Sequence, residues 1–270
     1  MNLASRIRRL ADFAGRYVHA TALVAHAFTL GLASRDRRQL IARLAREASY
    51  PRPAERRLPE IAIDDVARPT TAVALPHPVT QDGNVTLLEL VVLARIVAEI
   101  APSAVFEIGT FDGRTAVTLA ANAPEGSTIY TLDLPADHAT RFEVLDDDRR
   151  YIGNARSGTL LRSAQTRARI VSLFGDSATL DLSPYHADVV FIDGSHAYDY
   201  VLSDSRRAFE LLRDGRGIVL WHDYGEWDDV TRALNELYAR DPRFRSLRHI
   251  RGTSLAILRV NPEPAAAHQG

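Results

Sequence analysis

The chain has 270 residues, 46% of them hydrophobic and 25% charged, which suits one large globular domain with a sizeable core. It contains no cysteine, and all 33 of its basic residues are arginine. Disulfides, thiolate metal sites, a cysteine nucleophile, Schiff-base chemistry and a P-loop lysine are therefore excluded. The 34 acidic residues leave a net charge of −1, so composition gives no reason to expect a nucleic-acid partner.

The basic charge is concentrated near the N-terminus. Residues 1–60 hold 12 arginines and 5 acidic residues, a net charge of +7, which leaves −8 for the remaining residues. Residues 1–48 are predicted to form two arginine-rich amphipathic helices, followed by a proline-rich, irregular linker over residues 49–83. This extension, residues 1–83, is expected to serve assembly into a homo-oligomer or the substrate entrance. A membrane-surface or nucleic-acid arm is the less favoured alternative.

The most apolar stretch of the extension is Ala20–Ala33. It is shorter than the about 20 apolar residues needed to cross a bilayer, and His26 interrupts it. The segment continues into Arg35, Arg37 and Arg38 without the cleavage site of a secretory signal. We therefore predict a cytoplasmic protein with no stable membrane insertion.

From Asn84 onward, helical patterns alternate with short apolar runs. Thr86 and Glu89 form a capping box that opens an apolar helix to about Ile100. The later apolar runs predict strands, and the amphipathic segments between them predict helices. Strands are expected at residues 104–108, 128–132, 169–174, 187–192, 217–221, 244–249 and 253–260, and helices near residues 114–122, 201–212 and 228–239.

This alternation is typical of an α/β, doubly wound, Rossmann-like fold, with a mostly parallel sheet of seven strands covered on both faces. The domain is predicted to span residues 84–261, with a flexible tail at residues 262–270. In such sheets ligands bind at the carboxyl ends of the strands. The residues that follow each strand are therefore the candidates for a functional site.

The first candidate motif is VFEIGTFDGRT at residues 105–115. The strand delivers Glu107, Gly109 turns the chain, and Gly113 lets the next helix pack closely. Such a turn lets a ligand approach the backbone, and an acid at a strand end binds an amine or hydroxyl. Phe111 stands where dinucleotide-binding loops carry a second glycine, so a nucleoside without a pyrophosphate fits better. A simple strand–turn–helix is the alternative.

The second candidate is Asp133, which ends the next strand 24 residues after Gly109, where a carboxylate can hold a ribose diol. Together the two motifs resemble class I S-adenosylmethionine-dependent methyltransferases. The resemblance implies that Glu107 and the turn with Gly109, Thr110 and Gly113 bind the methionine end of S-adenosylmethionine. It also implies that Asp133 binds the ribose.

The third strand is followed by the sequence FGDS, which contains Asp176 and Ser177. In this position the sequence resembles the segment of the same family that contacts adenine. A helix N-cap near Ser177 is an alternative role for Asp176, and the two roles are compatible.

Two further acids follow the fourth and fifth strands, Asp193 in FIDGSH and Asp223 in WHDY. The family resemblance makes these strands neighbours, so the carboxylates are expected side by side, where they repel unless a cation lies between them. With no lysine in the chain, a divalent cation such as Mg²⁺ is the expected partner. His222 is a candidate third ligand. Imidazole suits softer metals, so a structural position pointing into the sheet is the favoured alternative.

His196 lies three residues after Asp193 on the loop that leaves the same strand. A neutral imidazole there could take a proton from a substrate hydroxyl, so His196 is the candidate catalytic base. The alternative is a histidine that caps the following helix or bonds to Asp193.

The order of these motifs over residues 84–260 resembles the metal-dependent macrocin and mycinamicin sugar O-methyltransferases. The resemblance implies S-adenosylmethionine and Mg²⁺, or another divalent cation, as cofactors and a small-molecule hydroxyl as acceptor. The sugar enzymes carry an acid where His222 stands, and the catechol-type enzymes use a lysine that this chain lacks. A nicotinamide-dependent oxidoreductase and a non-catalytic nucleoside-binding partner protein are the alternative functions.

Overall fold

The computed structural model describes residues 3–29, 33–34, 38, 54–81, 83–153 and 157–261. The chain forms two compact units, residues 1–52 and residues 53–270. In the first unit, α1 (Leu3–Phe28) is one long helix. The second helix predicted within residues 1–48, and the tail predicted at residues 262–270, lie outside the described residues. No helix in the described part of the chain has the length and hydropathy to cross a membrane.

The second unit is built on one eight-stranded sheet in the order β1-β7-β8-β6-β5-β2-β3-β4. Strand β8 runs antiparallel to β6 and β7, and the other neighbouring pairs are parallel. The strands are β1 (Glu60–Ile61), β2 (Ala104–Ile108), β3 (Thr128–Asp133), β4 (Arg169–Phe174), β5 (Val189–Ile192), β6 (Gly217–Trp221), β7 (Arg248–Ile250) and β8 (Ala256–Val260). The predicted fold class is confirmed, and the short β1 adds an eighth strand at one edge.

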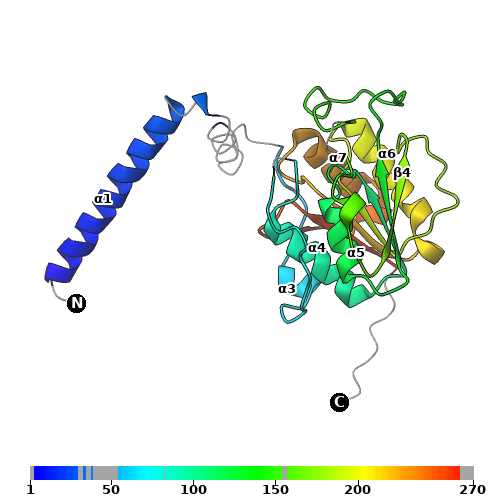
Figure 1. Cartoon of the computed structure of the whole chain (residues 1–270), viewed down its shortest axis with the longest axis horizontal. Helices are drawn as coiled ribbons and strands as arrows, with labels where there is room; N and C mark the ends of the chain where they lie inside the picture. The colour runs from blue at the N-terminus through cyan, green and yellow to red at the C-terminus, as the bar shows by residue number, and fades with distance from the viewer. Residues whose placement is uncertain are drawn as a thin grey trace, which may run out of the picture. The chain divides into compact units, whose positions relative to one another are not determined.

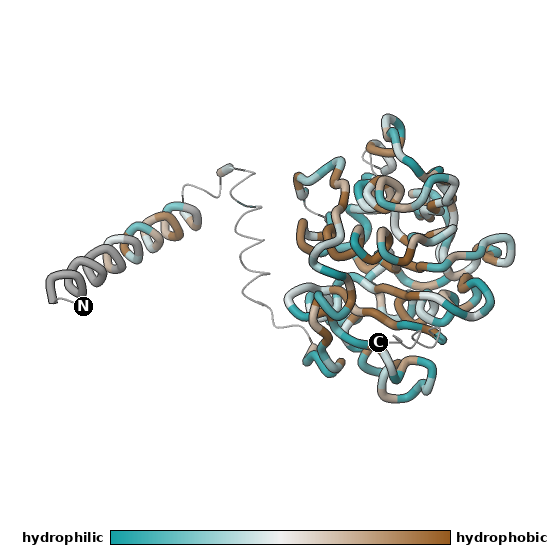
Figure 2. Tube along the Cα trace, turned by 90° about the horizontal axis from the view of Figure 1, so that it is seen from below, coloured by the Kyte–Doolittle hydropathy of each residue, from teal (hydrophilic) through white to brown (hydrophobic). Residues whose placement is uncertain are grey.

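Helices cover both faces of this sheet (Figure 1). One hydrophobic core lies between the sheet and α4 (Leu87–Ile100) with α5 (Arg114–Asn122), and the other lies against α6 (Tyr198–Leu211) and α7 (Asp228–Arg240). Short helical turns connect these elements: α3 (Ile63–Val66), η2 (Leu161–Ser163), η3 (Arg213–Gly215) and η4 (Pro242–Phe244). Figure 2 shows hydrophobic and hydrophilic stretches alternating along the chain, as a doubly covered sheet requires.

The start of α4 follows the predicted capping box. Thr86 Oγ1 accepts a hydrogen bond from the backbone N–H of Glu89, and the Glu89 carboxylate accepts one from the N–H of Thr86 at 2.8 Å. The Glu89 side chain is buried, although capping residues usually face water. This burial places the carboxylate inside the domain, where it has further partners.

Strand β7 begins four residues later than the sequence predicts. The side chain of Asp241 accepts a hydrogen bond from the N–H of Arg243 at 3.0 Å and caps the helical turn η4. The chain therefore completes a turn, closed by the bond from Leu247 N to the Phe244 carbonyl, before it extends.

Residues 54–81 belong to the second unit, whereas the sequence analysis assigned them to the N-terminal extension. Leu58, Val66 and Ala67 are buried in its cores. The hydroxyl of Tyr224 accepts hydrogen bonds from the N–H groups of Arg57 at 2.7 Å and Leu58 at 2.9 Å. The division between extension and domain at residue 83 stays a prediction.

Asp204 on α6 makes the stability of this fold depend on pH. Its carboxyl is buried, and its Oδ1 has no hydrogen-bond partner. Burial, reinforced by the charge of Asp176, raises the pKa of Asp204 to about 7, against an opposing hydrogen bond from Ser177. The folded state therefore keeps a proton that the unfolded chain loses near pH 4, so stability falls as the pH rises from about 4 to about 7.

We expect Asp204→Asn to remove this dependence. The free energy of unfolding should be nearly unchanged at pH 4, where the wild-type carboxyl is protonated in the folded state. At pH 8 it should rise by roughly 2–4 kcal/mol, since each pKa unit corresponds to about 1.4 kcal/mol. Denaturant unfolding of both proteins at the two pH values measures the difference. An equal change at both values would contradict the assignment.

Candidate active site

The carboxyl ends of the central parallel strands bring together most of the predicted site residues. Strand β5 pairs with β2 on one side and with β6 on the other. Asp193 directly follows β5, and Asp223 lies two residues after the end of β6. The predicted adjacency of these two strands is confirmed, and the two acids lie at one edge of the sheet.

His222 lies between these two acids. Its Nδ1 is 3.1 Å from Oδ1 of Asp193 and 3.0 Å from Oδ2 of Asp223. Within the residues that the structure describes, these three side chains form the only cluster whose ligand atoms could hold a metal ion, all within 4.8 Å of one another. The ring of His222 therefore faces the carboxylates instead of serving only to fill space in the sheet.

A third acid holds His222 from its other side. Nε2 of His222 is 3.2 Å from Oε2 of Glu89, the capping-box residue of α4. The other carboxylate oxygen of Glu89 accepts hydrogen bonds from Ser254, from N–H at 2.6 Å and from Oγ at 2.8 Å. The sequence identified Glu89 as a helix cap, and no sequence signal pointed to this second role.

His196 is held by two acids and one aromatic ring. Its Nε2 is 2.8 Å from Oδ2 of Asp223, and its Nδ1 contacts the carboxylate of Asp148. Asp148 also accepts hydrogen bonds from the hydroxyl of Ser195 at 2.8 Å and from the N–H of His196 at 2.9 Å. Trp227 stacks on the imidazole, with the ring centres 3.9 Å apart and an angle of 8° between the planes. The hydrogen bond of His196 thus goes to Asp223, whereas the non-catalytic alternative from the sequence placed it on Asp193.

The charges of this cluster shift its pKa values strongly. Burial would lower the pKa of both imidazoles, but the charge of Asp223 with its neighbouring carboxylates outweighs it. The pKa of His196 rises to about 10, and the pKa of His222 rises well above its ordinary value. Burial and the adjacent Asp223 raise the pKa of Asp193, although His222 partly offsets them. For Asp223 the two imidazoles outweigh burial, and the pKa falls.

The donor set of this cluster fits a divalent cation. Neighbouring ligand atoms on an octahedral ion with bonds of about 2.1 Å lie about 3.0 Å apart. The two distances from Nδ1 of His222 to the carboxylate oxygens, 3.0 and 3.1 Å, are hydrogen-bond distances in this structure, and they are short enough for the three groups to share one ion. The cluster also has carboxyl groups in excess, since Glu89, Asp148, Asp193 and Asp223 surround two imidazoles. Asp193, His222 and Asp223 are therefore suitable as metal ligands.

The predicted contacts for the methionine end of the cofactor lie beside this cluster, after β2. Glu107 is buried and accepts a hydrogen bond from the hydroxyl of Thr131, whose oxygen is 2.7 Å from that of Thr110. Burial, followed by the charges of Asp193 and Asp133, raises the pKa of Glu107 well above its ordinary value. A cationic amino group would offset this concentration of acids.

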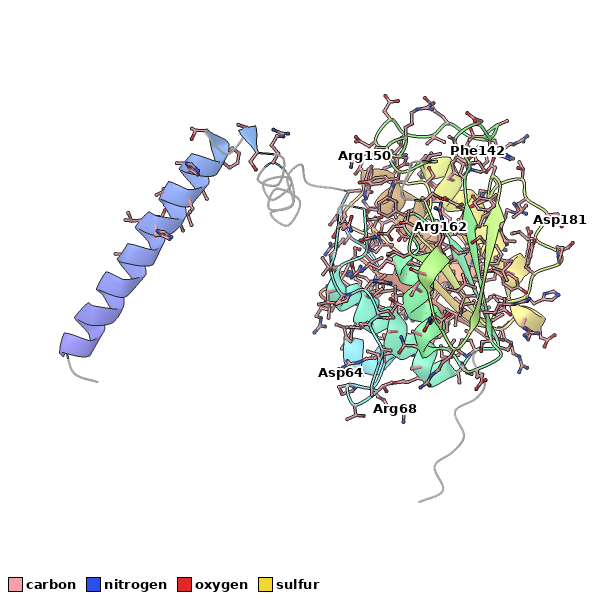
Figure 3. The ribbon with its side chains drawn as sticks, viewed as in Figure 1. Asp64, Arg68, Phe142, Arg150, Arg162 and Asp181 are labelled. Carbon is pink, nitrogen blue, oxygen red and sulfur yellow. The ribbon has the colours of Figure 1, made fainter. Side chains whose placement is uncertain are left out.

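The predicted ribose acid lies beside a cavity. The carboxylate of Asp133 accepts a hydrogen bond from the hydroxyl of Ser157, and burial raises its pKa. Ser157 lines a cavity of about 480 Å³, a size typical of small-molecule sites. Arg162, labelled in Figure 3, lines it as well. The remaining lining residues are Thr110, Gly158, Leu161, Ile170, Ser172 and Phe174.

The two glycines of the first motif are required by protein neighbours. Gly109 has φ of +100°, and a Cβ there would lie 2.0 Å from the carbonyl oxygen of Asp193. At Gly113, with φ of +87°, a Cβ would lie 2.6 Å from the side chain of Leu161. Both positions exclude other residues through close packing in the protein itself. The Gly109 turn thus lets the chain after β2 pass directly against the metal-ligand candidate Asp193.

Asp176 and Ser177 follow β4, which β2 and β3 separate from β5 in the sheet. The carboxylate of Asp176 accepts hydrogen bonds from the N–H groups of Arg141 at 2.7 Å and Ala178 at 2.9 Å. The carbonyl of Ser177 accepts one from the side chain of Arg207. Asp176 therefore organises the turn after β4. A turn and no helix follows at Ser177, so the N-cap alternative is wrong, and contact with adenine stays a prediction.

Residues 106–224 match the model of a methyltransferase domain family, Methyltransf_24. No curated protein sequence matches the chain. The structure is similar to the O-methyltransferase TomG from Streptomyces achromogenes, at 18% identity and a TM-score of 0.47, over 66% of this chain and 82% of that one.

Two further solved structures have the same TM-score of 0.47. The calicheamicin methyltransferase CalS11 is 20% identical over 64% of this chain and 77% of its own. A putative O-methyltransferase from Klebsiella pneumoniae is 18% identical over 67% of this chain and 84% of its own.

The matched region runs from β2 to just beyond β6, and thus contains every predicted site residue after the strand ends. The match argues against the alternative of a nicotinamide-dependent oxidoreductase. Taken with the observed sheet order, it shows that residues 106–224 form a methyltransferase domain.

Proposed function

We propose that this methyltransferase is a divalent-metal-assisted O-methyltransferase that acts on a hydroxyl group of a small molecule, such as a sugar or natural product. The observation that carries the proposal is the cluster of Asp193, His222 and Asp223, which has the spacing of metal ligands and lies in contact with His196. Such a site suits an acceptor that must lose a proton before it can attack a methyl group.

The three clustered residues would hold the cation. A bound divalent cation supplies charge that lowers the pKa of a nearby hydroxyl and fixes its orientation. His222 and the two acids also position each other through the contacts at 3.0 and 3.1 Å. This arrangement makes the acceptor hydroxyl, and not the already activated sulfonium methyl, the group that the site prepares for reaction.

His196 would take the proton of the acceptor at its Nε2. In this structure both ring nitrogens face carboxylates, so the ring is charged at neutral pH. The base role therefore requires Asp223 to release Nε2 and engage another positive group. Asp148 on Nδ1 and the stacked Trp227 keep the ring oriented meanwhile. Asp148 is a positioning residue in this proposal.

The donor side would use Glu107, Gly109, Thr110, Gly113 and Asp133, as the family resemblance implies, with Asp176 and Ser177 nearer to adenine. The support is the cavity beside Ser157 and the concentration of buried acids around Glu107, which suits the positively charged methionine end. Assembly into a homo-oligomer through residues 1–83 is also proposed and has no bearing on this chemistry.

The proposed function predicts a metal-dependent transfer to oxygen. Metal-free protein should be incubated with methyl-labelled S-adenosylmethionine and a panel of sugar and phenol acceptors, with and without added Mg²⁺ or Mn²⁺. We expect an O-methylated product whose formation stops in excess chelator. Methylation at nitrogen or carbon, or an undiminished rate in chelator, would overturn the proposal.

A further prediction concerns the ribose contact. Asp133→Ala should weaken binding of S-adenosylhomocysteine by about 1–3 kcal/mol, because the ribose hydroxyls lose a carboxylate acceptor. Asp181→Ala is the matched control, since it makes the same change at an exposed position outside the lining of the cavity. Calorimetry should show weaker binding for the first variant only. Equal affinity of the Asp133 variant and the wild type would refute the assignment.

A further inference from the structure

The hydrogen bonds of Glu89 fix a proton on Nε2 of His222. The Glu89 carboxylate accepts four hydrogen bonds besides its contact with His222, two from Thr86 and two from Ser254. A carboxylate in this position acts only as an acceptor. The ring nitrogen that faces it, Nε2 at 3.2 Å, must therefore be the donor. The other nitrogen, Nδ1, faces the two clustered acids and donates to them in this structure, so a cation held by these acids would displace the proton of Nδ1 and leave that of Nε2.

This is the arrangement by which proteins prepare a histidine to bind a metal. A ligating histidine donates its second N–H to a carboxylate or carbonyl, which fixes the ring and makes the ligating nitrogen more basic. Here Glu89 is buried at the start of α4, and its backbone position is fixed by the capping box with Thr86. The contact with His222 spans 133 residues of sequence, so it depends on the completed fold.

The donor set then bears on the kind of metal. One imidazole with two carboxylates suits borderline ions such as Mn²⁺, Fe²⁺ and Co²⁺, whereas Mg²⁺ prefers oxygen alone.

We infer that Glu89 is a positioning residue that fixes His222 with Nδ1 as its ligand atom, and that the site consequently selects a transition-metal ion such as Mn²⁺ over Mg²⁺. This inference narrows the divalent cation expected from the sequence, and it rests on the proposed metal-assisted function. The imidazole at position 222 is the feature that favours Mn²⁺ over Mg²⁺.

The first test is metal selectivity, measured without turnover. Mn²⁺ binding to the metal-free protein is followed by electron paramagnetic resonance, and Mg²⁺ is titrated as the competitor. We expect Mn²⁺ to bind at least about 100-fold more tightly than Mg²⁺. In His222→Asp, which offers a third carboxylate, this ratio should fall at least tenfold.

The second test addresses Glu89 directly. In Glu89→Gln a neutral amide replaces the carboxylate that faces Nε2 of His222, so the proton on Nε2 loses its charged acceptor. His222 should then be a weaker ligand through Nδ1, and Mn²⁺ affinity should fall about 10- to 100-fold. Nitrogen-15 spectra of the histidines report which ring nitrogen carries the proton. Thr86→Ala is the matched control, because it removes the capping hydroxyl and leaves the contact between Glu89 and His222.

The outcomes separate this inference from the function on which it rests. If neither cation binds at millimolar concentration, the metal-assisted function itself fails. If both cations bind and the ratio is the same in wild type and His222→Asp, metal assistance stands and the inference about selectivity is overturned. If Glu89→Gln does not fold, the spectrum of the wild type still decides the positioning role. An Nε2 without a proton there would refute it.

Discussion

Replacing Asp223 with asparagine is expected to abolish methyl transfer while S-adenosylhomocysteine still binds. Asp223 is the residue that joins the two halves of the site, since its Oδ2 lies 2.8 Å from Nε2 of His196 and 3.0 Å from Nδ1 of His222. The change removes a carboxylate from the proposed metal site and the charge that both imidazoles face. We expect the rate to fall by about 10³ or more, because a bound cation contributes several kcal/mol to such reactions.

The backbone should tolerate this change. Asp223 has φ of +66°, in the left-handed region, which asparagine adopts as readily as aspartate. The bond from Asp223 N–H to Ser254 Oγ at 3.2 Å involves only the main chain of residue 223 and should persist. The loss of rate can then be attributed to the side chain.

The matched control is Asp181→Asn, which makes the same chemical change at an exposed position on the outside of the second unit (Figure 3). Methyl transfer is measured in single-turnover reactions, and cofactor binding is measured by calorimetry. The control should behave as the wild type in both. Activity of Asp223→Asn within tenfold of the wild type would remove Asp223 from the catalytic machinery.

The strands and the acids that follow them could be predicted because each is encoded locally. An apolar run such as residues 189–192 is buried on both faces, and the polar residue that ends it must lie at the edge of the sheet. Once the order of β5 and β6 was expected from the family, Asp193 and Asp223 had to be neighbours. The clustering of Asp193 and Asp223 thus followed from the local apolar runs and the strand order of the family.

Asp148 could not be predicted, because its role depends on a contact between distant segments. It is the last of three consecutive aspartates, and Asp146 is exposed whereas Asp148 is buried against His196. Residues 134–160 contain no helix or strand among those described, so no periodicity marks the buried member of this run. Asp148 is buried because its carboxylate accepts hydrogen bonds from Ser195 and His196, which lie 47 and 48 residues further along the chain.

Glu89 and Gly109 show how a local interpretation can be correct and incomplete. The capping box accounts for the contacts of Glu89 with Thr86, but its contacts with Ser254 and His222 span 165 and 133 residues. Gly109 was expected to make room for a ligand. The structure shows that the carbonyl of Asp193 already occupies the space beside it. In both cases a motif predicts the local geometry, and the fold determines the partner.

His196 and Asp148 should behave as one catalytic unit. His196→Ala is expected to lower the rate of methyl transfer by about 10²–10⁴, the usual contribution of general acid–base catalysis, while cation and cofactor remain bound. Asp148→Asn should also lower the rate, because an amide cannot accept at once from Nδ1, Ser195 and the backbone of His196. The ring would then lose its fixed orientation toward Asp223.

The double variant distinguishes positioning from an independent contribution. If Asp148 acts only through His196, Asp148→Asn should cost nothing further once His196 is alanine, so the two effects are strongly non-additive. The wild-type rate should rise with pH as the imidazole loses its proton. This rising limb of the pH–rate profile should vanish in His196→Ala. Additive losses in the double variant would instead mean that Asp148 supports the loop of Ser195 and not the base. A pH limb that survives in His196→Ala would mean that the proton of the acceptor leaves by another route.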